Sequence, residues 1–163
     1  MTTGRSSGFL RAGLLALIAI LLPAAASAQP RSIDIVPRSD LHFGSIIASP
    51  AGGSVTVTPA GNRTTAGVFG VGGVGFGAGV FDVSWGATGN PHYQIVLPAS
   101  VTLSSGGSSM IVDSFLSDPA NQGQAKPPAR SDTLRVGATL RVGPNQPGGN
   151  YTGSYFVTVH LMN

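Results

Sequence analysis

The fold class is decided by a stretch near the C-terminus that reads Tyr155-Phe156-Val157-Thr158-Val159-His160-Leu161. Its apolar side chains recur at every second residue, the spacing that places them on one face of a β-strand. Shorter alternating stretches occur at Ser32 to Val36, Val55 to Val57 and Val80 to Trp85. Because no stretch of ten residues has a capped helical face, the sequence predicts an all-β protein.

Composition supports this class. The 163 residues include 24 Gly and 12 Pro, which favour many turns between short strands. Only 9% of the residues are charged, which excludes a coiled coil and a charge-driven disordered chain. There is no Cys, and therefore no disulfide or thiolate metal site. We expect an antiparallel β-sandwich of about 8–10 strands.

Residues 1–28 read as a secretory signal peptide. Arg5 and Arg11 precede an apolar run from Gly13 to Leu22, and Ala26-Ser27-Ala28 resembles a cleavage site. The run is shorter than the roughly 20 residues that a membrane-spanning helix needs, so we expect no stable membrane span after cleavage. A retained anchor is the alternative. The expected product is a single β-sandwich domain at 29–163 in the periplasm, on the cell surface or outside the cell.

Charge gives no indication of a nucleic-acid partner. After the signal peptide the Lys and Arg residues are scattered, with no basic run. The segment from Gly70 to Gly75 fits the dinucleotide pattern G-x-G-x-x-G, but the glycines that follow it cannot start a helix for a pyrophosphate. We interpret Gly67 to Gly79 as a flexible or closely packed segment, with an edge strand as one form of it.

No residue pattern points to catalysis, a metal or a cofactor. The histidines His42, His92 and His160 are far apart and form no metal-ligand spacing. No two aspartates stand close together, and no G-x-S-x-G motif occurs. We therefore expect a protein that is not an enzyme. The single tryptophan, Trp85, is expected to anchor the core.

An ordered set of motifs resembles the secreted bacterial family catalogued as domain of unknown function four-four-zero-two, over about Ile33 to Leu161. The motifs are Leu41-His42-Phe43-Gly44, Pro59 to Thr65, Leu97 to Leu103, Met110 to Phe115, Val136 to Val142 and Pro147 to Gly153. The pattern from Gly149 to Gly153, followed by alternating apolar residues, is also similar to the end of fimbrial subunits and spore-coat-U-type domains. That likeness implies an immunoglobulin-like sandwich, which in those families is completed by a strand from a chaperone and then from a neighbouring subunit.

The resemblance leads to two hypotheses. The first is a non-enzymatic exported structural protein, a fimbrial or surface-appendage subunit that assembles by β-strand addition with like subunits and a periplasmic chaperone. Its contact edge would contain Tyr151, Tyr155, Val157, Val159 and Leu161. The donor segment would be Gln29 to Asp40, with Ile33 and Ile35 as its apolar side chains, unless that segment is the first strand of a self-complete sandwich. The alternative is a self-complete secreted or periplasmic binding module for a carbohydrate or protein ligand.

Overall fold

The computed structural model describes residues 32–72, 75–86, 92–124 and 131–162, and this part of the chain contains no helix. The signal peptide predicted at 1–28 lies outside the described residues. Strands account for most of the described residues, and the prediction of an all-β antiparallel sandwich is confirmed. The strands are β1 (Ile33–Ser39), β2 (His42–Phe43), β3 (Ile46–Ile47), β4 (Gly53–Val57), β5 (Arg63–Ala66), β6 (Phe69–Gly70), β7 (Phe76–Gly77), β8 (Gly79–Trp85), β9 (His92–Val96), β10 (Ser100–Ser105), β11 (Ser108–Asp118), β12 (Gln122–Gln124), β13 (Ser131–Val142) and β14 (Thr158–Met162).

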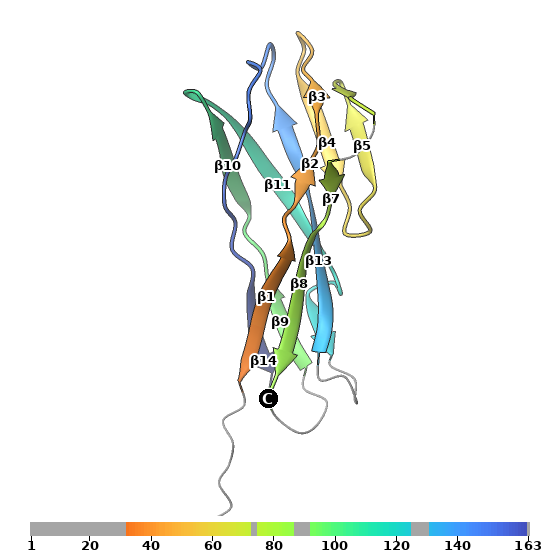
Figure 1. The fold of residues 1–163 in the computed structure, drawn as a ribbon, viewed down its shortest axis with the longest axis vertical. Helices are drawn as coiled ribbons and strands as arrows, with labels where there is room; N and C mark the ends of the chain where they lie inside the picture. The colour runs from red at the N-terminus through yellow and green to blue at the C-terminus, as the bar shows by residue number, and fades with distance from the viewer. Residues whose placement is uncertain (1–31, 73–74, 87–91, 125–130, 163) are drawn as a thin grey trace, which may run out of the picture.

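The long strand β13 organises the main sheet. Its first half pairs with β8 and its second half with β4, while β11 runs along its other side. The sheet therefore forks, with β8 and β1 in the lower half of Figure 1 and β4 and β5 in the upper half. Gly137 lies at the fork, where the backbone of Val57 and Thr58 leaves no space for a Cβ.

A second layer covers this sheet. Below, it consists of the sheet β12-β9-β14, and above, of the short pairs β2–β7 and β3–β6. The two short pairs continue the ladder between β1 and β8, so one antiparallel ribbon curls from the main sheet into the second layer (Figure 1). The glycine-rich segment thus contributes β6 and β7, which agrees with the edge-strand interpretation.

Apolar side chains between the layers form two clusters. The upper core contains Phe43, Val55, Val57, Val68, Met110, Val112, Ala138, Leu140 and Val142. The lower core contains Val83, Trp85, Tyr93, Ile95, Leu134 and Val136. Phe115 packs against both clusters and so connects them. The buried position of Trp85 confirms the sequence prediction for that residue.

Strand β11 differs from the predicted alternation. The sequence places Phe115 on the face opposite Met110 and Val112, but the structure has all three facing the core. The reason is a bulge, because the register with β13 shifts between Asp113 and Leu116 and Ser114 adopts a φ of 53°. One inserted residue moves the next side chain to the other face of the strand.

Candidate assembly edge

The C-terminal segment forms a strand over only part of its length. Thr152 makes an isolated bridge to Ser104, with N–O distances of 2.9 and 3.1 Å. Residues 153–157 belong to no β-ladder, and β14 then pairs with β9. Within the described residues β14 has no second strand partner, so it is an edge of its sheet. The single long strand expected from Tyr155 to Leu161 is therefore wrong in its first half.

The unpaired part nevertheless keeps the alternation of a strand. Tyr155, Val157 and Val159 are half-buried and pack against the lower core. Between them Phe156 points outward and is 83% exposed. An extended segment of this kind has backbone N–H and C=O groups that are available to another strand.

Tyr151 does not lie on this edge. It packs against the upper core, and its hydroxyl donates a 2.8 Å hydrogen bond to the carbonyl oxygen of Pro147. The same hydroxyl accepts a 2.8 Å hydrogen bond from Nε2 of Gln146. These contacts fix the turn that leads into the terminal segment. The structure therefore gives Tyr151 a place in this turn, apart from the candidate edge.

Tyr155 ties the unpaired segment to the centre of the molecule. Its ring lies edge-on to Phe81, with centroids 6.1 Å apart, and 5.5 Å from the ring centroid of Phe115. Its hydroxyl packs against Gly79, where no Cβ would fit, and it is buried without a hydrogen-bond partner among the described residues. Burial, with a smaller contribution from the negative charge of Asp40, raises the pKa of Tyr155 to about 12. The hydroxyl is therefore neutral at physiological pH.

The candidate donor residues lie within the protein's own sandwich. Ile33 and Ile35 belong to β1, pair with Trp85 and Val83 of β8, and pack against the lower core. Strand β1 is the last strand of the main sheet and lies beside β14 without pairing to it. One side of the lower half is thus bounded by two edge strands, β1 and β14.

The side of the sandwich between β1 and β14, which we call the open side, is less deeply buried than the centre. The buried side chains of the lower core come from β8, β9 and β13, whereas those from β1 and the terminal segment are only half-buried. Of the residues predicted for the site, the structure brings five together here. They are Ile33, Ile35, Tyr155, Val157 and Val159. Leu161 is half-buried opposite Tyr93 in the β9–β14 ladder.

A protein-family model described as Domain of unknown function (DUF4402) matches residues 33–160. The chain belongs to this family. The match begins at β1 and ends within β14, so the DUF4402 domain includes both strands that bound the open side. No curated protein and no solved structure matches the chain.

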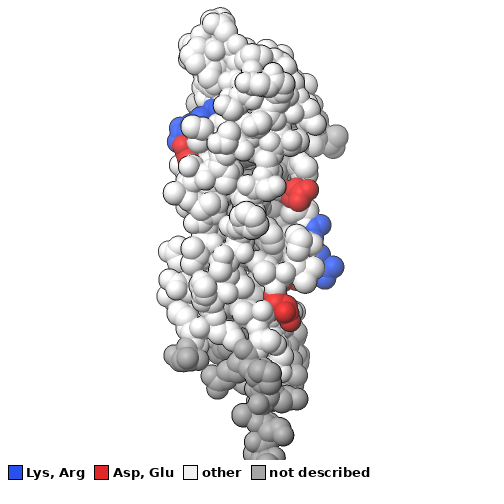
Figure 2. Space-filling model, turned by 90° about the vertical axis from the view of Figure 1, so that its left-hand side faces the viewer, with Lys and Arg blue, Asp and Glu red and all other residues white. Residues whose placement is uncertain are grey.

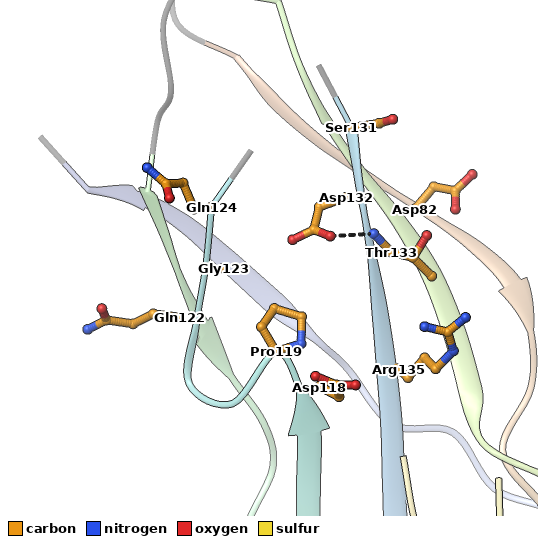
Figure 3. Close-up of a pocket in the computed structure, with 10 residues that line it drawn as sticks. All are labelled: Asp82, Asp118, Pro119, Gln122, Gly123, Gln124, Ser131, Asp132, Thr133 and Arg135. Carbon is orange, nitrogen blue, oxygen red and sulfur yellow. Dashed lines mark hydrogen bonds between the residues drawn. The ribbon is translucent and has the colours of Figure 1, made fainter. Parts of the chain in front are cut away.

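The DUF4402 domain also carries a polar groove of about 780 Å³ beside β12 (Figure 3). Three aspartates line the groove, although no two aspartates are close together in the sequence. The cross-strand pairings place these aspartates on two different faces of the sheet. Asp82 and Asp118 lie opposite Thr133 and Arg135 on the outer face, whereas Asp132 lies on the face of Leu134. No group of three or more histidines and aspartates suited to a metal ion occurs in the described part of the chain.

Asp132 is already engaged by its neighbours. It accepts a 2.7 Å hydrogen bond from the hydroxyl of Tyr93 and a 2.8 Å hydrogen bond from the backbone N–H of Thr133, which is dashed in Figure 3. Burial, and then Asp132 itself, raise the pKa of Tyr93. These contacts leave less of the Asp132 carboxylate free for a ligand.

Charged side chains are sparse on the DUF4402 domain. Figure 2 shows one face on which a few acidic and basic groups stand among uncharged residues. Both ion pairs among the described residues lie at the surface, Arg38 with Asp82 at 2.6 Å and Arg141 with Asp113 at 2.9 Å. The hydrogen bond from Arg141 holds the pKa of Asp113 below its usual value. None of the described residues forms a helix that could cross a membrane.

Proposed function

We propose that this protein is a non-enzymatic, exported structural subunit that assembles by β-strand addition along residues 153–162. The proposal rests on two features, which are the signal peptide predicted at 1–28 and the open side bounded by β1 and β14. A fimbrial or other surface appendage is the kind of structure such a subunit would build. Like subunits, and a periplasmic chaperone before assembly, are the partners we propose.

One observation carries the proposal. From residue 154 to 157 the side chains alternate between solvent and the core, as they do in a strand, yet residues 153–157 belong to no ladder. The segment continues into β14, which pairs with β9 alone among the described strands. An incoming strand would satisfy these backbone groups, and its alternate side chains would cover the half-buried residues beneath.

We propose β1 of a neighbouring copy as the donor. Its two inward-facing apolar side chains, Ile33 and Ile35, already pack against the lower core, and its remaining residues are exposed. Released from β8, β1 of one copy would pair with residues 153–162 of the next copy, where Ile33 and Ile35 would again face the lower core. The ladder between β1 and β8 is irregular at one point, where its register shifts between Pro37 and Ser39.

The test replaces Phe156, whose side chain is exposed in the single chain and would gain a cross-strand neighbour from an added strand. Such a pair contributes roughly 0.2–1 kcal/mol, so Phe156→Ser should weaken association about two- to fivefold. The measurement is size-exclusion chromatography with light scattering over a range of concentrations. The control is Leu116→Ser, because Leu116 is 61% exposed on β11, in the other layer. A stable monomer at every concentration, or equal effects of the two substitutions, would contradict the proposal.

The donor is tested separately. The full chain should bind a synthetic peptide of residues 29–40, and the peptide should raise its melting temperature and slow hydrogen exchange at the amides of residues 153–157. A peptide with Ile33→Ser and Ile35→Ser is the matched control. If the unaltered peptide neither binds nor stabilises this chain, β1 is not the donor, and the acceptor edge remains open to other strands.

The second candidate function is a self-complete binding module. Two observations favour it: β1 completes its own sheet, and the polar groove beside β12 offers amide, carboxylate and guanidinium groups to a hydrophilic ligand such as a carbohydrate. Isothermal titration calorimetry with oligosaccharides should then show saturable heat that Arg135→Ala abolishes. Titrations without heat would contradict this function.

A further inference from the structure

A second sheet edge, strand β5, differs from the other edges of the main sheet. Strand β1 carries Pro37 and the ion pair of Arg38 with Asp82, so while it pairs with β8 its outer edge is a poor acceptor for an added strand, although the strand itself can be donated. The edge of β10 is covered by the bridge from Ser104 to Thr152. Strand β5 pairs only with β4 within the described part of the protein, and its residues Thr64 to Ala66 are exposed and uncharged. In Figure 1 it forms the right-hand margin of the upper half.

The one charge on β5 is directed away from this edge. The guanidinium of Arg63 donates hydrogen bonds to the carbonyl oxygens of Phe43 (3.2 Å) and Val71 (2.8 Å) in the second layer. Its Cζ also lies 4.3 Å from the ring centroid of Phe76. Arg63 is the only Lys, Arg, Asp or Glu between Phe43 and Gly79. The edge thus presents backbone groups, small uncharged side chains and no free charge.

We infer that β5 pairs antiparallel with β5 of a second copy of this chain, about a two-fold axis at Thr65. This register places Thr65 opposite Thr65 of the second copy, and Thr64 opposite its Ala66. Directly opposite residues then face the same side, so the two main sheets become one continuous sheet. The contact is separate from the edge formed by residues 153–162, and does not depend on it.

The sequence of β5 favours a second copy over an unrelated strand. A two-fold contact must be self-complementary, and here no like charges meet, because Arg63 lies opposite Gly67 in this register. Threonine pairs across an antiparallel ladder are favourable. Strand β6, which lies beside β5, adds Phe69, whose side chain is 70% exposed. A contact of five residue pairs is small, so the expected dimer is weak and concentration-dependent.

The experiment places charges at the centre of the contact. In the purified protein, Thr65→Lys puts two ammonium groups opposite each other in the dimer and should raise its dissociation constant about tenfold or more. Thr65→Glu should do the same. An equimolar mixture of the two variants should restore association, because unlike charges then meet. Ser109→Lys is the control, since Ser109 is exposed on β11, away from β5. Sedimentation velocity up to about 1 mM protein provides the measurement.

Each outcome decides the inference. Loss of the dimer in both single variants and its return in the mixture support the pairing of β5 with itself. A wild-type protein that is monomeric at about 1 mM overturns it. So does a Thr65→Lys variant that associates as tightly as the wild type, or a mixture that stays dissociated. Circular dichroism of each variant shows whether it is folded, and the mixture distinguishes lost pairing from lost structure. Assembly through residues 153–162 would survive all of these substitutions.

Discussion

Arg63 joins the two layers of the upper half through contacts that a lysine would not reproduce. Its planar guanidinium reaches the carbonyl oxygens of Phe43, Ser45 and Val71 and stacks on the ring of Phe76. Gly44 and Gly70 make room for it, because a Cβ at either glycine would lie 2.7 or 2.8 Å from a guanidinium nitrogen. The side chain therefore connects β5 to the ribbon formed by β2, β3, β6 and β7.

Replacing Arg63 should therefore destabilise the fold. We expect Arg63→Lys to lower the free energy of unfolding by about 2 kcal/mol, since one ammonium group cannot reach the three carbonyl oxygens and the ring of Phe76 at the same time. Urea denaturation followed by tryptophan fluorescence of Trp85 measures the change.

The control for this prediction is Arg141→Lys. Arg141 lies on the exposed face of β13 and pairs with Asp113 at the surface, where an ion pair contributes little to stability. Its replacement should have a much smaller effect. Equal losses for the two substitutions would show that Arg63 does not join the layers.

At the scale of elements, the bulge in β11 determines which side chains enter the core. Ser114 adopts a left-handed backbone conformation, which residues with branched side chains rarely adopt. We expect Ser114→Val to lower the free energy of unfolding by about 1–2 kcal/mol, and Ser114→Gly to cost nothing. Thermal unfolding checks both.

The matched substitution on the same strand is Ser109→Val. Ser109 is exposed and extended, opposite Ser104, so valine suits it. We expect no loss of stability there. A Ser114→Val protein as stable as Ser109→Val would contradict the bulge.

The elements that the sequence predicted are those in which alternation is unbroken. The inward faces of β4 and β8 follow directly from Val55, Val57, Val83 and Trp85, because a half-buried strand alternates. The bulge was missed because no residue type at Ser114 marks it. Strands β5 and β12 were missed since they bring few apolar side chains to the core and are recruited by their neighbours β4 and β9.

The candidate edge, too, could be predicted from the sequence only in part. Alternation identified Tyr155, Val157 and Val159 as one face, which the structure bears out. It did not reveal that residues 153–157 have no ladder, because that depends on where distant strands begin and end. Alternation assigned Phe156 to the solvent-facing side of the segment and gave it no role. An exposed aromatic residue between Tyr155 and Val157 is nevertheless the one local signal in the sequence of a surface that a partner could contact.

At the scale of the whole molecule, the two proposed contacts lie on different strands of an elongated sandwich (Figure 1). Strand addition at residues 153–162 joins subunits along one side, and pairing through β5 joins copies through the other end of the forked sheet. The first contact would build a chain of subunits, and the second would link neighbouring chains. Neither requires chemistry at a reactive side chain.

Hydrogen–deuterium exchange at the amides of residues 153–157 tests the central claim most directly. In the monomer these amides should exchange rapidly, whereas those in the middle of β13 are protected by two neighbouring strands. In the assembled protein we predict that exchange at residues 153–157 slows by about tenfold or more, while β13 is unchanged. Assembled protein in which these five amides exchange as fast as in the monomer would contradict strand addition at this edge.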